Sequence, residues 1–314
     1  MKNNKVIIGT RSSQLAVGQT QMVADMLDEL CPDYEFALKK ITTKGDKILD
    51  KPLAQVGGKG LFIKELEVAL LEEEVDLAIH SMKDMPAELP ENLAITAIPK
   101  RVDPRDALIS NNDILLDDLP KGARIGTGSL RRTAQLLKYR PDLDIVPIRG
   151  NIDTRIKKLQ DEELNLDAII LAAAGLLRMG WKDKITQYLE PDVVLPAAGQ
   201  GALAIETREN DERISEVVAK VDDQETKYRL EAERGFLEYL EGDCQVPIGA
   251  FAEVNGNNIT LEGMVSTLDG KECLQKTISG SVDEAAELGV KLAKELVEEG
   301  AKEILKKVRQ ETDK

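Results

Sequence analysis

A strand-then-helix rhythm runs along residues 5–99 and starts again beyond residue 100. Short apolar stretches predict strands, and apolar residues at helical spacing predict the helices between them. The strands are expected at 5–10, 35–42, 76–81 and 93–99, and the helices at 12–30, capped by Ser12 or Ser13, and at 63–75. Strands that alternate with helices are typical of a parallel, doubly wound sheet, so we predict an α/β domain over residues 1–99.

The same rhythm predicts a second α/β domain over residues 100–199. Its strands are expected at 123–129, 144–150 and 166–176, and its helices at 129–140, capped by Ser129, and at 151–164, capped by Asn151 or Asp153. Residues 196–208 are rich in Gly and Ala and then strand-like, as expected if the chain crosses back into the first domain. Residues 200–219 are therefore assigned to the first domain.

The pattern changes from about residue 220 onward. Alternating apolar residues with Asn-Gly and Asp-Gly turns predict an antiparallel meander, and one amphipathic helix is expected from about Val282 to Val308. The predicted fold is thus α/β, with two periplasmic-binding-protein-like doubly wound domains and a C-terminal α+β domain, 220–314, with an antiparallel sheet. Residues 43–62 contain three clustered glycines and little periodicity, which predicts a mobile loop.

The charge of the chain is uneven. The net charge is −15, yet residues 121–158 hold ten Lys or Arg against three Asp. Such a chain repels nucleic acid over most of its surface and attracts a small anion to one region, although a solvated basic helix face is the alternative. Neither a membrane span nor a signal peptide is recognisable, which favours a cytoplasmic protein. Three scattered cysteines and one histidine predict neither a disulfide framework nor a metal site.

Three strand-to-helix turns combine small polar residues with arginine: "GTRSS" (9–13), "GTGSLRR" (126–132) and "RGNIDTR" (149–155). A helix N-terminus offers backbone N–H groups to an anion, and a guanidinium grips a carboxylate through two hydrogen bonds. The turns carry five arginines: Arg11, Arg131, Arg132, Arg149 and Arg155. We expect a ligand with several carboxylates; the alternative is surface arginines that pair with the abundant acids.

Reactive side chains follow the strand 76–81. Lys83 and Asp84 lie at its carboxyl end, where α/β proteins hold their reactive groups, and Asp84 could stabilise a developing cation. His80 lies inside the strand and is more typical of a structural group than of a base. Cys244, in the turn-rich stretch "GDCQVPIGA", is either an exposed nucleophile or an inert loop cysteine.

Five motifs in this order resemble those of the porphobilinogen deaminase (hydroxymethylbilane synthase) family: "HSMKDMP", "GTGSLRR", "RGNIDTR", "PAAGQGALAIE" and "GDCQVPIGA". The resemblance covers essentially the whole chain. It implies a transferase of tetrapyrrole and heme biosynthesis that joins four porphobilinogen molecules, releases ammonia each time and finally hydrolyses off hydroxymethylbilane. It also implies a monomer that hands its product to uroporphyrinogen-III synthase, without nucleic acid, membrane or metal.

The resemblance also implies the roles of individual residues. A dipyrromethane cofactor would be joined by a thioether to Cys244, and Asp84 would be the catalytic acid–base group, with His80 as a structural neighbour. Binding of cofactor or substrate carboxylates would fall to Arg11, Ser13, Lys59, Ser81, Lys83, Thr127, Ser129, Arg131, Arg132, Arg149, Asn151, Arg155 and Gln200. Residues 43–62, with Lys59 and Phe62, would be a flexible lid.

One position departs from the family pattern. A small residue usually precedes the cysteine, as in Gly-Gly-Cys, whereas this chain has Asp243. A neighbouring carboxylate raises the pKa of a thiol, so we expect slower cofactor loading than in an Asp243→Gly variant. Equal loading rates at neutral pH would contradict this.

Two other classes compete with the enzyme. A non-catalytic binding protein of the periplasmic type shares the paired α/β domains, but it predicts a signal peptide and needs neither Cys244 nor Asp84. Nucleic-acid binding by residues 121–158 conflicts with the charge of −15 and with the lack of aromatic stacking residues there.

Overall fold

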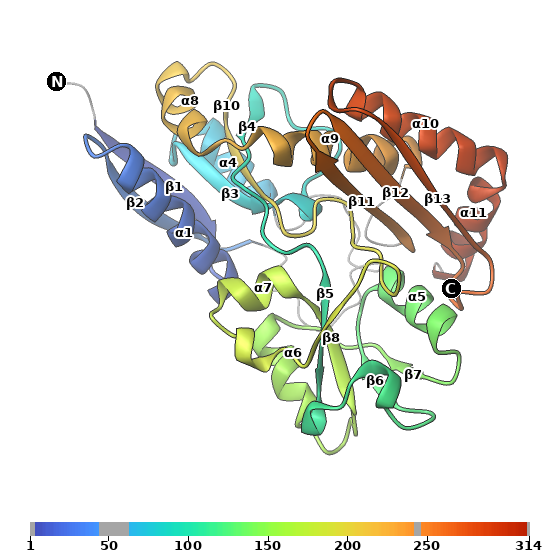
Figure 1. Ribbon diagram of the computed structural model, residues 1–314. Helices are drawn as coiled ribbons and strands as arrows, with labels where there is room; N and C mark the ends of the chain where they lie inside the picture. The colour runs from blue at the N-terminus through green and yellow to red at the C-terminus, as the bar shows by residue number, and fades with distance from the viewer. Residues whose placement is uncertain (1–3, 44–62, 242–245, 313–314) are drawn as a thin grey trace. The chain divides into compact units, whose positions relative to one another are not determined.

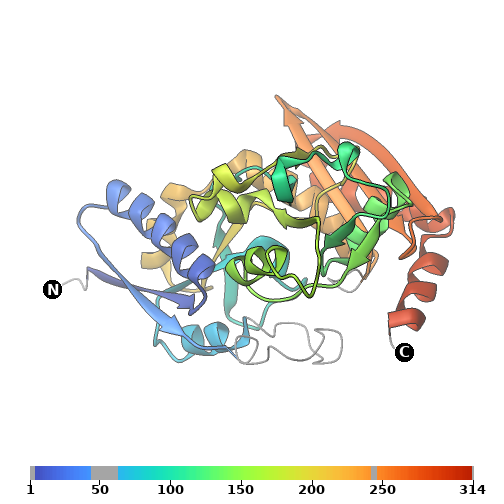
Figure 2. The ribbon, with the colours of Figure 1, turned by 90° about the horizontal axis from the view of Figure 1, so that it is seen from below.

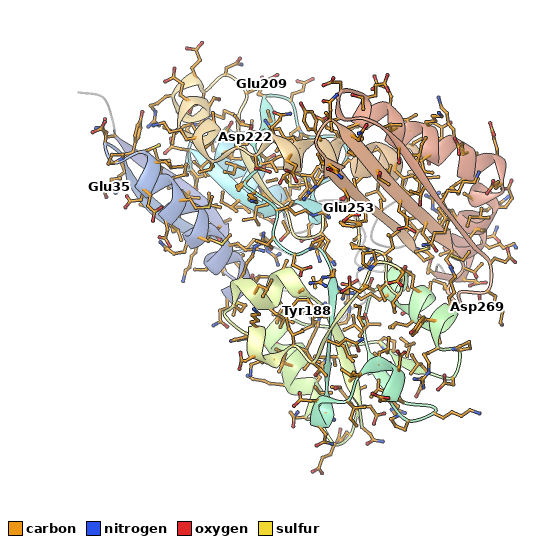
Figure 3. The ribbon with its side chains drawn as sticks, in the orientation of Figure 1. Glu35, Tyr188, Glu209, Asp222, Glu253 and Asp269 are labelled. Atoms are coloured by element: carbon orange, nitrogen blue, oxygen red, sulfur yellow. The ribbon has the colours of Figure 1, made fainter. Side chains whose placement is uncertain are left out.

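The structure is a computed structural model that describes residues 4–43, 63–241 and 246–312 (Figure 1). The chain divides into two compact units, Met1–Val102 with Gly201–Thr226, and Asp103–Gln200 with Lys227–Lys314. Among the described residues, no helix combines the length and the apolar character that crossing a membrane requires. Exposed acids occur in both units; Glu35, Glu209 and Asp269 are labelled in Figure 3.

The first unit is built on a five-stranded sheet in the order β2-β1-β3-β10-β4. Its strands are β1 (Lys5–Arg11), β2 (Glu35–Ile41), β3 (Leu77–Ser81), β4 (Leu93–Ala97) and β10 (Leu203–Arg208). β1 runs parallel to β2 and β3, whereas β10 runs antiparallel to β3 and β4. The return of the chain at 196–208 is thus confirmed, but the predicted all-parallel sheet is wrong, because the returning strand enters from the opposite end.

Helices cover both faces of this sheet. α1 (Gln14–Leu30) and α8 (Glu212–Val218) share a buried cluster with Ile8 and Ile79, and α1 lies along β1 and β2 in Figure 2. α4 (Lys64–Leu71) packs on the other face, where Leu66 and Leu70 contact a cluster that includes Ala78. The two faces of β3 are therefore both covered, as in a doubly wound sheet.

The second unit holds a sheet in the order β7-β6-β8-β5-β9. Its strands are β5 (Asp106–Ser110), β6 (Arg124–Gly126), β7 (Asp144–Val146), β8 (Ala168–Ala172) and β9 (Gln187–Leu189). β6 is parallel to β7 and β8, and β5 is antiparallel to β8 and β9. The helices are α5 (Leu130–Tyr139), α6 (Ile152–Leu159) and α7 (Ala173–Arg178). α5 packs on one face, and α6 and α7 on the other.

The C-terminal part of the second unit contains the predicted meander. β11 (Ile248–Asn255), β12 (Asn258–Ser266) and β13 (Cys273–Ser281) pair antiparallel, with turns at Gly256 and Gly270. α10 (Ala285–Glu298) and α11 (Ala301–Thr312) cover this sheet, and α9 (Gln224–Tyr239) precedes it (Figure 1). The single helix predicted from Val282 to Val308 is wrong: Gly300, at φ 105°, ends the helical path between α10 and α11.

Short 3-10 turns complete the described chain: η1 (Met82–Asp84), η2 (Asn111–Asp113), η3 (Leu116–Asp118), η4 (Lys182–Lys184), η5 (Ala219–Val221) and η6 (Val282–Glu284).

The three sheets follow the three predicted segments of the chain, with β10 contributing to the first. The boundaries 1–99 with 200–219, 100–199 and 220–314 stay a proposal, since the compact units place the second and third segments together.

Candidate functional site

Asp84 stands at the end of the first sheet. β3 ends at Ser81 and continues directly into η1, whose Met82 and whose following Met85 are 2% and 7% exposed. These two apolar anchors hold the turn, while Asp84 between them is exposed. Among the described residues, its carboxylate has no hydrogen-bond or ion-pair partner. An unpartnered carboxylate at a strand's carboxyl end is available to a ligand.

Other predicted residues lie at the same edge of this sheet, because β1 and β3 run parallel. Arg11 ends β1, and the Ser81 hydroxyl lies 3.3 Å from the side-chain nitrogen of Gln19 on α1. Ser13 caps α1 by accepting a hydrogen bond from the N–H of Ala16 at 3.3 Å, which confirms one of its two predicted caps. Lys83 is half-buried. These residues belong to the first unit.

His80 is 5% exposed, inside the packing between β3 and α4. Its Nε2 lies 2.9 Å from Oε2 of Glu206 on β10. A buried imidazole beside a buried carboxylate is not open to a ligand in this structure. The location fits the prediction of a structural histidine.

In the second unit, the turns after β6 and β7 lie against each other. The N–H of Thr127 donates to the carbonyl of Val146 at 3.0 Å, and a Cβ at Gly128 would lie 2.7 Å from the carbonyl oxygen of Ile148. This close approach requires glycine at position 128. Ser129 caps α5 as predicted, accepting from the N–H of Arg132 at 3.5 Å.

Asp106 gathers three of the predicted binding residues. Its carboxylate, fully buried on β5, lies 2.8 Å from Nη2 of Arg131 and 2.7 Å from Nη2 of Arg132. The amide nitrogen of Gln200 donates to the same carboxylate at 3.0 Å. Burial alone would raise the pKa of Asp106, but the two guanidiniums and these hydrogen bonds lower it to about 2. Asp106 is therefore the anion that holds this network.

Arg155 lies on α6 among like charges. Its Nε donates to the carbonyl of Gly150 at 2.8 Å. Burial, followed by repulsion from Arg132 and Arg149, lowers the pKa of Arg155 to about 10. Asn151 is the N-cap of α6 without a side-chain capping bond, and its side chain is exposed. A desolvated guanidinium that is repelled by two others favours an anionic ligand.

Two residues of this region were missed from sequence. Asp106 opens the unpredicted strand β5. Arg178 ends α7, the helix that follows β8, and burial lowers its pKa to about 10. The signal available for Arg178 was its position after the predicted strand 166–176.

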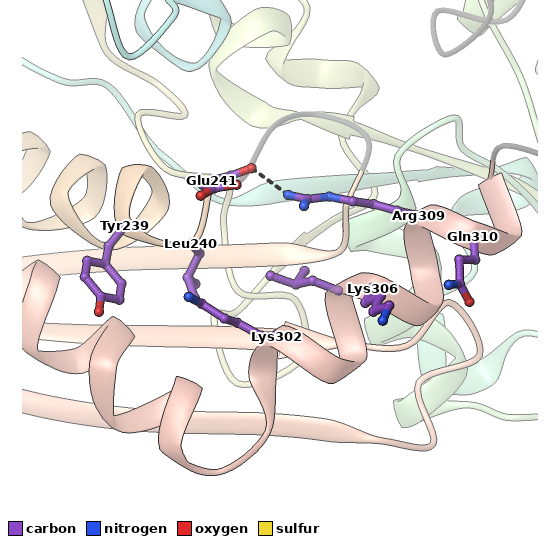
Figure 4. A pocket seen from close by; sticks show the side chains of 8 residues that line it. Tyr239, Leu240, Glu241, Lys302, Lys306, Arg309 and Gln310 are labelled. Carbon is purple, nitrogen blue, oxygen red and sulfur yellow. Dashed lines mark hydrogen bonds between the residues drawn. The ribbon is translucent and has the colours of Figure 1, made fainter.

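Cys244, Lys59, Phe62 and Asp243 lie outside the described residues, so their roles remain predictions. A cavity of about 350 Å³ lies where α9 ends, and none of the predicted site residues that the structure describes lines it (Figure 4). Three cations of α11 border it: Lys302, Lys306 and Arg309. Arg309 donates to the carbonyl of Glu241 at 2.9 Å and so fixes the backbone at the end of the described segment.

Two doubly wound sheets, an antiparallel-sheet module and arginine-rich turns define an α/β protein that attracts a small anion. Family models described as "Porphobilinogen deaminase, dipyromethane cofactor binding domain" and "Porphobilinogen deaminase, C-terminal domain" match residues 6–216 and 227–298. The porphobilinogen deaminase of Oceanobacillus iheyensis is 53% identical over 98% of this chain and 99% of its own. That of Bacillus subtilis is 53% identical over 98% and 97%.

The chain therefore belongs to the porphobilinogen deaminase family. It is a transferase of tetrapyrrole and heme biosynthesis, which condenses four porphobilinogen molecules with loss of ammonia and releases hydroxymethylbilane. A solved structure of the periplasmic aliphatic sulphonate binding protein of Escherichia coli is also similar, with 12% identity, a TM-score of 0.39 and coverage of 76% of this chain and 71% of that chain.

Proposed function

We propose that the arginine cluster of the second unit binds the acetate and propionate groups of the growing pyrrole chain. The position of Arg155 carries this proposal: its Nε donates to the carbonyl of Gly150 at 2.8 Å, and burial together with the charges of Arg132 and Arg149 lowers its pKa. A carboxylate ligand restores that lost solvation with charge-assisted hydrogen bonds. The buried network around Asp106 would contribute to the same binding through its three members Arg131, Arg132 and Gln200.

The remaining binding residues are proposed to supply hydrogen bonds to carboxylates of the cofactor or of the substrate. In the first unit these are Arg11, Ser13, Ser81 and Lys83, and in the second unit Thr127, Ser129, Arg149 and Asn151, together with Lys59 outside the described residues. Those that the structure describes share a place in or beside a turn that follows a strand. Such turns present backbone N–H groups and cations to an anion.

Asp84 is proposed as the acid–base group. Its exposed carboxylate would accept a hydrogen bond from the pyrrole N–H and stabilise the cation left when porphobilinogen loses ammonia. His80, buried on β3, would not transfer protons to the substrate. The same carboxylate could carry the protons of deamination and coupling.

The residues present fit a dipyrromethane cofactor, since a group with four carboxylates matches the arginine-rich turns of the chain and the buried Arg155 beside Arg132 and Arg149. When bound, the cofactor supplies the first two rings, to which further rings are added. Cys244 is proposed to hold it through a thioether. The proposal also includes a cytoplasmic monomer that hands hydroxymethylbilane to uroporphyrinogen-III synthase.

The covalent link is tested by the intact mass of the denatured protein beside a Cys244→Ser variant. An excess mass equal to two linked pyrrole units, absent from the variant, is the expected result. If the wild-type protein has a bare polypeptide mass, it is incubated with porphobilinogen. Failure to acquire the two units then contradicts the role of Cys244, whereas ammonia release measured in parallel tests the activity itself.

A further inference from the structure

Glu206 and His80 form a buried contact that the chemistry described above does not use. His80 and Glu206 have side chains 3% and 0% exposed, and their Nε2 and Oε2 atoms lie 2.9 Å apart. The atoms are within ion-pair distance but not aligned as a hydrogen bond, and neither oxygen of Glu206 has a hydrogen-bond partner among the described residues. A buried carboxylate in this condition is costly. Apolar residues often stabilise a core as well as a buried pair of ionisable side chains does. A contribution to stability alone therefore does not account for the presence of His80 and Glu206 at these positions.

The sheet register explains why the two side chains meet. In the antiparallel pairing of β3 and β10, His80 lies opposite Ala204, and Glu206 lies opposite Ala78. All four residues share one face, so His80 and Glu206 are diagonal neighbours. α4 covers this face, and its Glu67 is only 9% exposed. Burial and the charge of Glu206 raise the pKa of Glu67, while His80 and Lys64 oppose the rise.

The charged groups that face this cluster come from three elements. β3 supplies His80, β10 supplies Glu206, and α4 supplies Glu67 and Lys64. Further along β10, Arg208 is engaged with the carbonyls of Leu70 and Val75 and with Asp211. Two carboxylates and one imidazole thus share a volume of low dielectric constant, where a charge on one group acts strongly on its neighbours.

The end of β3 is held from three directions. Ser81 contacts Gln19 on α1, the N–H of Met82 donates to the carbonyl of Ala202 at 3.1 Å, and His80 contacts Glu206. Of these three anchors, the contact of His80 with Glu206 is the one between two ionisable side chains. Asp84 follows within four residues of His80 and lacks a partner of its own among the described residues. The three contacts at the end of β3 therefore determine where its carboxylate lies.

We propose that Glu206 and His80, with Glu67 beside them, are positioning residues that hold the end of β3 so that the Asp84 carboxylate meets the substrate. The inference rests on the role of Asp84 given above under the proposed function. Placement errors of about 1 Å lower turnover by about a hundredfold in enzymes, so a small relaxation of this strand end is measurable.

The test compares Glu206→Gln, His80→Gln and Thr207→Val in the holoenzyme, with hydroxymethylbilane formation from porphobilinogen as the readout. Thr207 is the matched control: it is fully buried on β10 next to Glu206, and its hydroxyl lies 2.5 Å from that of Thr96. We expect Glu206→Gln and His80→Gln to lower kcat about tenfold with KM changed less than about twofold. The pH profile of kcat should be shifted in both variants relative to the wild-type enzyme. Thr207→Val should lose stability but keep the wild-type kcat and pH profile.

Wild-type kcat and pH profile in both folded variants would overturn the inference. If Glu206→Gln does not fold, the double variant His80→Gln with Glu206→Gln carries the test, because it removes both members of the buried contact together. An Asp84→Asn variant separates the two proposals. If Asp84→Asn is inactive and the Glu206 and His80 variants are normal, only this inference fails; if Asp84→Asn turns over normally, the role of Asp84 fails first.

Discussion

Arg132 donates two hydrogen bonds to a single oxygen of Asp106, from Nε at 2.9 Å and from Nη2 at 2.7 Å. The same guanidinium is one of the two charges that repel Arg155. Arg132 is therefore shared between a buried anion that holds it and a region that attracts a second anion. This arrangement fixes the cation before any ligand arrives, which reduces the ordering that binding must cause.

Asp106→Asn should destabilise the protein strongly, because it leaves the buried guanidiniums of Arg131 and Arg132 without their carboxylate. The expected loss in the free energy of unfolding is about 3–5 kcal/mol in urea denaturation. Asp144→Asn is the control, since its pair with Arg124 at 3.2 Å is exposed and should contribute less than about 1 kcal/mol. Equal losses in the two variants would contradict the assignment of Asp106 as the anchor.

The same network predicts a response to acid. The pKa of Asp106 in the folded protein is about 2, below its ordinary value of 3.8, so its contribution is complete above pH 3.8 and is lost as the pH falls toward 2. The free energy of unfolding of the wild-type protein should decline steeply in that range. In Asp106→Asn the decline in the free energy of unfolding that is due to Asp106 should be absent. If the variant still shows the same decline, other carboxylates cause it.

Arg155→Met should stabilise the ligand-free protein and weaken substrate binding. Because the folded state lowers the pKa of Arg155 to about 10, its charge opposes folding at neutral pH, and its removal should add about 1–3 kcal/mol to the free energy of unfolding. The same change should raise KM for porphobilinogen at least about tenfold, since charge-assisted hydrogen bonds are lost. Lys157→Met, an exposed change on the same helix, should affect neither quantity. A destabilised Arg155→Met protein would refute the account of the cluster.

Glu67→Gln should change how stability depends on pH. The folded state raises the pKa of Glu67 above 4.5, so the contribution of this side chain is present at low pH and is lost as the pH rises through the folded-state pKa. The variant should therefore gain stability relative to the wild-type protein as the pH increases from 4 to 8. Glu72→Gln, on the exposed end of the same helix, should show no such gain. Thermal unfolding at a series of pH values provides the measurement.

Asp84→Asn should abolish turnover without affecting the fold. Removal of a general acid–base group lowers kcat by about 10²–10⁴, whereas an exposed, unpartnered side chain changes stability by less than about 0.5 kcal/mol. Glu88→Gln, four positions further on and also exposed, should retain the wild-type rate. The rate of ammonia release from porphobilinogen is measured for both variants. Full activity in Asp84→Asn would exclude Asp84 as the acid–base group.

Local signals predicted local structure well. The N-caps Ser13 and Ser129 are where the sequence places them, and Gly256 and Gly270 form the expected meander turns. These features depend on contacts between residues close in the chain, which short patterns encode. The broken C-terminal helix shows the limit: amphipathic periodicity continues on both sides of Gly300, and only its positive φ separates the two helices.

Long-range partners could not be predicted. β5 begins with the charged Asp106, and its Arg132 and Gln200 partners lie 26 and 94 residues away. Nothing in a short window around Asp106 indicates that two arginines will neutralise it in the core. The antiparallel direction of β10 is likewise decided by where the chain re-enters the first sheet, and the His80 contact with Glu206 depends on that direction.

The position of β10 between β3 and β4 also has a consequence for synthesis on the ribosome. β10 lies between β3 and β4 in the sheet, yet β4 ends at Ala97 and β10 begins only at Leu203. β10 therefore emerges from the ribosome on the order of 5–20 s after β4 at ordinary translation speeds. During that interval β3 and β4 present open edges to other nascent chains. The nascent polypeptide is therefore most vulnerable to aggregation before residue 208 has left the exit tunnel, and a chaperone that shields β3 would act in that period.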